Sequence, residues 1–111
     1  MSEPDRVVLA EILRRVVAVA EPERVIMFGS AARGEMDADS DVDLIVVKGG
    51  PVHRGRLAED IYVSLVGVGQ AVDVIVVTPE DVERFGKVRH LVLEPALREG
   101  RVVYDRHAAD A

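Results

Sequence analysis

Two short motifs at a fixed distance from each other constrain this chain more than any other feature. Gly29-Ser30 follows an apolar run over residues 25–28, and ten residues later Asp41-Val42-Asp43 opens a second apolar run. Side chains two apart on a strand point to the same face, so Asp41 and Asp43 are expected side by side, with Cα atoms about 6–7 Å apart. Two adjacent carboxylates repel each other unless a cation lies between them. Since Mg²⁺ takes such oxygen ligands together with substrate phosphates, the pattern predicts a metal-binding pair of acids.

The Gly-Ser pair is a candidate phosphate-binding turn. Gly29 allows the backbone to approach a ligand closely, and Ser30 is expected at the start of a short helix that runs through Arg33. The N–H groups and the dipole at a helix start favour an anion. Arg33 is a further candidate for a phosphate contact because its guanidinium matches phosphate oxygens, although a solvated surface cation is an equally good interpretation. A phosphate turn beside a metal-binding pair is typical of nucleotide chemistry.

Each of these residues also has an ordinary structural interpretation when it is taken alone. Gly29-Ser30 fits a strand-to-helix turn, and Asp41 fits a capping residue. Asp43 is harder to explain in this way, because a carboxylate inside the apolar run Val42 to Val47 is costly in a buried strand unless it is paired or liganded. The combined motif therefore favours a functional site.

The pattern of apolar residues predicts a single α/β domain. Long amphipathic helices are expected where apolar residues recur at helical spacing, and strands where β-branched residues form short runs. The expected helices are 5–20, 52–68, 80–85 and, as a helix or turn, 91–98; the expected strands are 24–28, 42–47, 71–77 and 101–104, with residues 105–111 as a frayed tail. Tyr62 and Tyr104 are interpreted as packing residues.

A third acid, Asp73, is expected to join the first two. Parallel strands that are connected by a helix start at the same edge of a sheet, so the starts of strands 42–47 and 71–77 should coincide. The strand over 24–28 should run antiparallel to its neighbour and end at that same edge. Asp41, Asp43 and Asp73 then meet the Gly29-Ser30 turn at one cleft, unless Asp73 is a buried acid that binds loop N–H groups.

Composition narrows the class of protein. The chain has 111 residues, which suffices for one core, and it contains no cysteine, which favours a reducing compartment. Its formal net charge of −6 argues against nucleic acid as a direct partner, because that affinity depends on neutralising phosphates. No apolar run reaches a membrane span, and the start of the chain does not look like a signal peptide. We therefore expect a cytoplasmic protein with no membrane partner.

The motifs also carry a resemblance to a known family. Gly29-Ser30, the fixed spacing, Asp41-Val42-Asp43 and the later strand acid Asp73 resemble the signature of the nucleotidyltransferase superfamily of DNA polymerase β type. More narrowly, the chain is similar to the minimal nucleotidyltransferases that act as antitoxins of HEPN toxins. The resemblance extends over residues 23–104. It implies one minimal nucleotidyltransferase domain over residues 1–111, with a small mixed β-sheet flanked by helices.

The resemblance assigns a role to each candidate residue. Asp41 and Asp43 would hold two Mg²⁺ ions against the triphosphate of ATP, and Asp73 would complete the site as a metal ligand or as a general base. Gly29 and Ser30 would hold the β- and γ-phosphates, with Arg33 as an additional contact. The implied reaction is the transfer of AMP to a hydroxyl, with tyrosine as the expected acceptor, on a HEPN-type RNase toxin that is thereby neutralised.

The acceptor is expected on another polypeptide, because nothing beyond about Tyr104 looks able to form an acceptor domain. A homo- or hetero-oligomer is one way to supply the missing site. Two alternatives remain open at this point. The chain could be a non-catalytic binding module that neutralises its partner by occlusion, or a small-molecule nucleotidyltransferase whose acceptor site belongs to a separate subunit.

Overall fold

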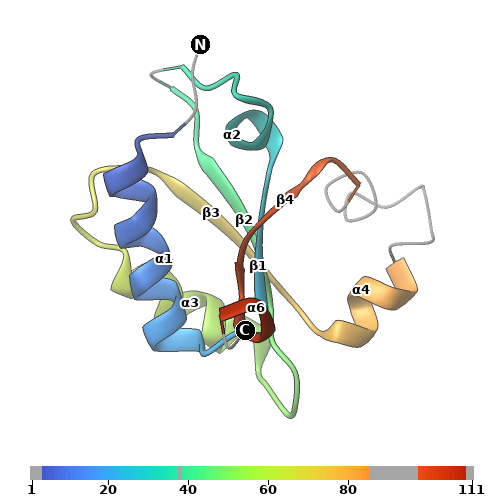
Figure 1. Cartoon of the computed structure of the whole chain (residues 1–111). Helices are drawn as coiled ribbons and strands as arrows, with labels where there is room; N and C mark the ends of the chain where they lie inside the picture. The colour runs from blue at the N-terminus through green and yellow to red at the C-terminus, as the bar shows by residue number, and fades with distance from the viewer. Residues whose placement is uncertain (1–3, 38, 86–97, 110–111) are drawn as a thin grey trace.

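Four strands form one mixed sheet in this computed structural model, which describes residues 4–37, 39–85 and 98–109 (Figure 1). The order across the sheet is β3-β2-β1-β4. β1 pairs antiparallel with both β2 and β4, and β2 pairs parallel with β3. Along the chain the elements are α1 (Arg6–Ala20), β1 (Arg24–Phe28), α2 (Gly29–Arg33), β2 (Val42–Val47), α3 (Arg54–Ser64), β3 (Val72–Val77), α4 (Pro79–Phe85), β4 (Arg101–Asp105) and α6 (Arg106–Ala109). The predicted α/β class and the predicted pairing of the first three strands are confirmed.

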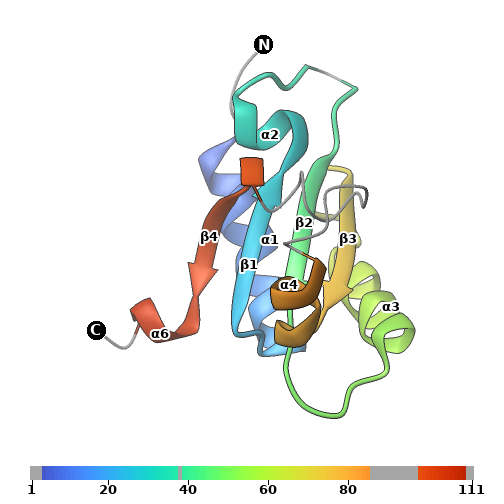
Figure 2. The ribbon, with the colours of Figure 1, turned by 90° about the vertical axis from the view of Figure 1, so that its right-hand side faces the viewer.

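Helices lie on both faces of the sheet, and they divide the core into two parts. α1 and α3 cover one face, where Ile12, Val16, Leu44 and Ile61 are fully buried in the larger cluster. α4 lies over the opposite face, which Figure 2 turns toward the viewer. There Ile26, Ile45, Val47 and Val77 form a smaller cluster. Alternate residues of β2 belong to alternate clusters, as the period of a strand requires, so Asp43 shares the face of the smaller cluster.

Sequence explains the bounds of α1. Asp5 caps the helix by accepting hydrogen bonds from the N–H groups of Val7 and Val8. The helix ends at Ala20, and Glu21 caps it: its φ of 45° is left-handed, and its N–H donates to the carbonyl of Val17. A proline follows at position 22 and cannot continue the helical hydrogen bonds. The predicted helix over 5–20 is confirmed to within one residue.

One arginine links α1 to α3. The Nη1 of Arg15 donates to the carbonyl oxygens of Ser64, the last residue of α3, at 3.1 Å and of Val66, just after the helix, at 3.0 Å. The carbonyls of the last helical turn, such as that of Ser64, have no partner within the helix. Arg15 and Arg14 also both donate to Glu11, so one carboxylate lies between two guanidinium groups. The interaction orients the two helices that carry the larger core cluster.

Several predicted element bounds need correction. The second long helix is shorter than the predicted 52–68: His53 caps its start through Nδ1, which accepts from the N–H of Arg56, and it ends at Ser64. The tail is not frayed as predicted over residues 105–109, because β4 extends through Asp105 and α6 follows. The helix or turn predicted over 91–98 lies outside the described residues, except for its last position. Among the described helices, none has both the length and the apolar character needed to span a bilayer.

Candidate active site

Two candidate acids, Asp43 and Asp73, lie in one row across the sheet, and Gly29 adjoins this row. The register pairs Phe28 of β1 with Asp43 of β2, and Asp43 with Asp73 of β3. Gly29 follows Phe28 directly and begins α2. The end of β1 and the starts of β2 and β3 therefore meet at one edge of the sheet, as the sequence predicted from the parallel crossover.

Asp41 lies directly before β2, whose predicted start at Val42 is confirmed. β2 begins at Val42, so Asp41 is the last loop residue before the sheet, and its side chain is exposed. The pairing of β2 with β3 starts one residue later, where the N–H of Val42 donates to the carbonyl of Ala71. Asp41 is nevertheless near enough for its charge to act on Asp43.

The pKa of Asp43 is raised above its usual value. Partial burial is the main cause, because it disfavours the charged form, and the negative charges of Asp73 and then Asp41 act in the same direction. Only Arg33 opposes them. The half-buried carboxylate of Asp43 thus lies between two further carboxylates, an arrangement that a bound cation would stabilise.

Glycine is required at position 29 for two separate reasons. Its φ of +70° lies in the left-handed region, which residues with a Cβ adopt at a cost. A Cβ at this position would also clash with Oδ2 of Asp43. The backbone of Gly29 therefore approaches the Asp43 carboxylate more closely than any other residue type allows, and half-buried Ser30 follows in the first turn of α2.

Arg33 already has acidic partners. Its Nε donates to Glu35, and its Nη1 lies 3.7 Å from Oε2 of Glu99, which comes from the segment before β4. Both ion pairs are about half exposed, so each contributes little to stability and can exchange with another anion. The predicted phosphate contact of Arg33 stays a prediction, in which phosphate replaces one of these carboxylates.

Tyr62 is the site residue that the sequence analysis missed. Its hydroxyl donates to Oδ1 of Asp73 at 3.0 Å and accepts from the backbone N–H of Val74 at 2.8 Å. Partial burial raises its pKa, the Val74 N–H lowers it and Asp73 raises it. The interpretation of Tyr62 as a packing residue is wrong: it caps a free backbone group on edge strand β3 and orients Asp73. One signal was available, since Tyr62 lies off the apolar stripe of Leu57, Ile61 and Leu65.

The fit of the acids to a metal ion rests on their chemistry. Among the described residues, no group of three or more histidine, cysteine, aspartate or glutamate side chains is gathered closely enough to hold a metal ion. Asp41, Asp43 and Asp73 are nevertheless the oxygen donors that a hard cation such as Mg²⁺ takes. Burial first, and then the charges of Asp73 and Asp41, raise the pKa of Asp43; a divalent cation at this edge would offset the part that is due to charge.

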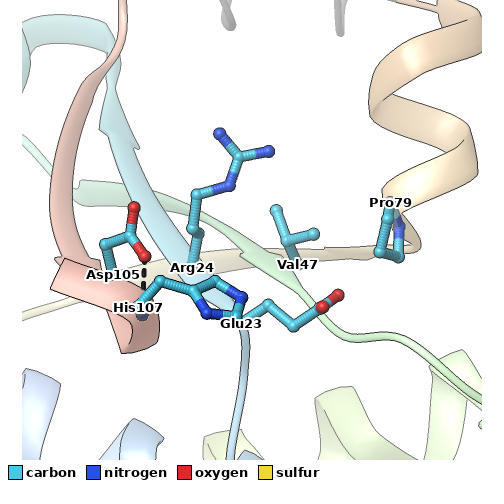
Figure 3. A pocket seen from close by; sticks show the side chains of 6 residues that line it. All are labelled: Glu23, Arg24, Val47, Pro79, Asp105 and His107. Carbon is cyan, nitrogen blue, oxygen red and sulfur yellow. Dashed lines mark hydrogen bonds between the residues drawn. The ribbon is translucent and has the colours of Figure 1, made fainter. Parts of the chain in front are cut away.

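A cavity of about 340 Å³ lies at the opposite end of the sheet (Figure 3). It is lined where β1 starts and β2 ends, by Glu23, Arg24, Val47, Pro79, Asp105 and His107. Val47 is four residues from Asp43 along β2, which corresponds to about 13 Å. This cavity is therefore separate from the row of acids.

Comparisons with known proteins bear on the family and the fold of this chain. The family model described as "Nucleotidyltransferase domain" matches residues 9–103. A candidate nucleotidyltransferase from Sulfolobus solfataricus, known from its crystal structure, has a similar fold, with a TM-score of 0.53 and 20% sequence identity. The similarity covers 94% of this chain and 92% of that one. A comparison with curated proteins finds no match for this chain.

The matched segment contains the row and the candidate residues that adjoin it. It begins within α1 and ends within β4, so Gly29, Ser30, Asp41, Asp43 and Asp73 all fall inside it. The match covers most of the chain, and the similar crystal structure supports the same fold independently of close sequence identity. The chain therefore belongs to the nucleotidyltransferase domain family, whose reaction is the transfer of a nucleotidyl group.

Proposed function

We propose that this protein is a Mg²⁺-dependent adenylyltransferase that moves AMP from ATP to a hydroxyl of a partner protein. The expected partner is a HEPN-type RNase toxin, with tyrosine as the acceptor, and the modification would make this chain the antitoxin of the pair. The observation that carries the proposal is the register that places Asp43 between Asp73 and the end of β1, where Gly29 begins α2.

Each candidate residue has a proposed task. Asp41 and Asp43 would hold two Mg²⁺ ions, which would supply positive charge to the attacking and leaving oxygens of an in-line displacement. The backbone of Gly29 and Ser30 would hold the β- and γ-phosphates, since the first N–H groups of a helix have no partner within it. Arg33 would add a phosphate contact by releasing one of its carboxylates.

The proposed transfer forms one bond and breaks one bond. The acceptor oxygen bonds to the α-phosphorus of ATP, the bond from that phosphorus to the oxygen bridging to the β-phosphorus breaks, and pyrophosphate leaves. The acceptor proton passes to Asp73 if this residue is the base, and to water if it is only a ligand. Tyr62 holds Oδ1 of Asp73, which leaves Oδ2 to face the acceptor hydroxyl.

Exposure of the site supports a macromolecular acceptor. Asp41 and Asp73 are exposed, and β3 is an edge strand of the sheet. A hydroxyl carried on the surface of another protein can therefore reach Asp73 from outside the fold. A small acceptor would need a pocket that holds it in place, and this exposed edge of the sheet provides little enclosure.

The proposal expects a gene for a HEPN-type protein beside the gene for this chain, and the test uses its product. It is mixed with this protein at a low molar ratio, with Mg²⁺ and ATP, and its intact mass and RNase activity are then followed. Enzymatic transfer predicts a mass gain in AMP units and inhibition at substoichiometric amounts. Asp73→Asn should abolish both, whereas Asp60→Asn, on the exposed surface of α3, should abolish neither.

An unmodified partner that is inhibited only at equimolar protein would contradict the proposal and favour a binding module. In that case Asp73→Asn would inhibit as well as the wild type. A neighbouring gene from a resistance or biosynthesis cluster, together with AMP transfer to a small molecule, would instead favour the small-molecule reaction.

A further inference from the structure

The cavity of about 340 Å³ at the far end of the sheet stands on a second row of paired residues. The register places Arg24 of β1 between Val47 of β2 and Asp105 of β4, and directly opposed residues project from the same face of a sheet. Val47 belongs to the smaller cluster, on the face that α4 covers. Pro79, the first residue of α4, adjoins the cavity. The proposed transfer uses none of these residues.

Arg24 contributes a guanidinium that has no hydrogen-bond or ion-pair partner in the part of the chain that the structure describes. Its side chain is half-buried and rises into the cavity between those of Asp105 and Val47 (Figure 3). A guanidinium carries five N–H donors and forms its strongest hydrogen bonds with carboxylates and phosphates. Arg24 therefore provides a place for an anionic group in the cavity.

Glu23 contributes a carboxylate that accepts no hydrogen bond from the described residues. Its Oε2 is buried without a partner, and its Oε1 lies 3.9 Å from Nη2 of Arg106, which is too far for a hydrogen bond. A buried acceptor that has no donor costs free energy. Glu23 therefore provides a place for a donor, and an ammonium group would be a strong one.

The backbone of Glu23 holds this carboxylate beside the cavity. Its N–H donates to the carbonyl of Val47 at 2.8 Å, and its carbonyl accepts from the N–H of Arg106 at 3.0 Å. The Glu23 side chain lines both the larger cavity and a smaller one of about 220 Å³. The last torsion of a glutamate side chain has broad minima, so rotation can turn either oxygen toward a donor in the larger cavity.

We propose that this cavity binds a small zwitterion of the α-amino acid class. The carboxylate of the ligand binds Arg24, its ammonium group binds Glu23, and its side chain contacts Val47 and Pro79, the apolar part of the lining. The volume of the cavity lies near the lower end of the range of about 300–1,000 Å³ that is typical of ligand pockets. A molecule as small as an amino acid suits such a volume.

The charges of the lining favour a zwitterion over an ion of one sign. Arg24 carries one positive charge, while Glu23 and Asp105 carry two negative charges. A simple anion would meet both carboxylates, and a simple cation would leave the guanidinium of Arg24 unpaired. Asp105 already has a partner, since its Oδ1 accepts from the N–H of His107 at 2.9 Å. Glu23 is therefore the carboxylate that we assign to the ammonium group.

This site is separable from the proposed chemistry. Val47 lies four residues from Asp43 along β2, which corresponds to about 13 Å. Ligand binding can therefore be measured without nucleotide or metal. A negative result would leave the proposed transfer untouched, and loss of transfer would leave this site untouched.

The test compares three ligands on the isotope-labelled wild-type chain by NMR. L-leucine carries both charges, N-acetyl-L-leucine lacks the ammonium group, and L-leucinamide lacks the carboxylate. L-leucine should bind with a Kd of about 1 mM or lower and shift the amide signals of Arg24 and His107, while each of the other two should bind at least about tenfold more weakly. This comparison needs no substitution, so its result does not depend on how a variant folds.

Two variants test the assigned contacts. Arg24→Met keeps a long side chain on β1 and removes the guanidinium, and Glu23→Gln keeps the shape of the side chain and removes its charge. Each should weaken the binding of L-leucine about tenfold or more. Arg56→Met and Glu59→Gln make the same changes on the exposed surface of α3 and should leave the binding unchanged.

The proposal is overturned if L-leucine shifts no signal at the cavity, if either derivative binds as tightly as L-leucine, or if Arg24→Met or Glu23→Gln binds L-leucine as the wild type does. Equal binding of N-acetyl-L-leucine would show a site for an anion, and equal binding of L-leucinamide a site for a cation. Shifts confined to Gly29 and Asp43 would place the ligand at the catalytic row instead.

Discussion

At the scale of single residues, the charge of Asp43 decides how the site behaves without a ligand. A carboxyl whose pKa is raised on folding destabilises the folded state in its charged form, and burial and the neighbouring Asp73 and Asp41 cause this here. The contribution of Asp43 to the stability of the metal-free protein therefore rises as the pH falls through that raised pKa. The free-energy cost of the charged Asp43 side chain at neutral pH follows from its partial burial and from the two acids beside it.

Asp43→Asn should stabilise the metal-free protein and abolish transfer. Removing the half-buried charge is expected to raise the free energy of unfolding by about 0.5–1 kcal/mol at pH 7, a range that allows for partial exposure of the group. Urea unfolding in EDTA at pH 7 and pH 4 measures the effect. The difference between variant and wild type should shrink at pH 4, and a clear loss of stability at pH 7 would show that the charge is structural.

Gly29→Ala should damage both the fold and the site. The left-handed backbone costs about 1–2 kcal/mol for a residue with a Cβ, and the added methyl would displace the Asp43 carboxylate. Gly50→Ala is the matched control, because Gly50 has a φ of +84° but no atom within 4 Å of the added Cβ. Both variants should lose stability in thermal unfolding, while only Gly29→Ala should lose ATP binding.

Tyr62→Phe should lower the rate of transfer without unfolding the protein. The substitution removes the donor to Asp73 and the acceptor for the Val74 N–H, and water can replace part of both because Tyr62 is 41% exposed. We expect a rate about three- to tenfold lower, for a loss of about 1 kcal/mol. Tyr104→Phe on β4 is the control. Equal rates of transfer for Tyr62→Phe and the wild type would show that Tyr62 has no role in the transfer.

At the scale of elements, the junction of α1 and α3 is a specific point of stability. Arg15 binds two carbonyls at the C-terminal end of α3 as well as Glu11, and its side chain is 27% exposed. Arg14 binds the same Glu11 but is 67% exposed and has no bond to α3. Neighbouring arginines with a shared partner thus have unequal roles.

Arg15→Met should therefore lower the free energy of unfolding by about 1–2 kcal/mol, whereas Arg14→Met should change it by less than about 0.5 kcal/mol. Both substitutions keep a long helix-compatible side chain. The midpoints of urea unfolding compare them directly. Equal midpoints for the two variants would show that the carbonyl contacts of Arg15 do not hold α3.

At the scale of the whole molecule, the sheet and its active edge could be predicted from local sequence. Short β-branched runs and a helix between two of them determine a parallel pair, and the crossover rule places Asp43 beside Asp73. Contacts between distant segments could not be predicted in this way. Tyr62 reaches Asp73 around the edge of β3, and Arg33 pairs with Glu99. Both depend on how whole elements pack, which periodicity does not encode.

The central claim is that Asp43 and Asp73, with the adjoining residues Gly29, Ser30 and Asp41, form a Mg²⁺-dependent ATP site. Isothermal titration of ATP into the protein, with Mg²⁺ and then with EDTA, tests it most directly. The account predicts binding with Mg²⁺, at least about tenfold weaker binding in EDTA, and no Mg²⁺ dependence in Asp41→Asn/Asp43→Asn. Equal affinity in both conditions, or no binding in either, would contradict it.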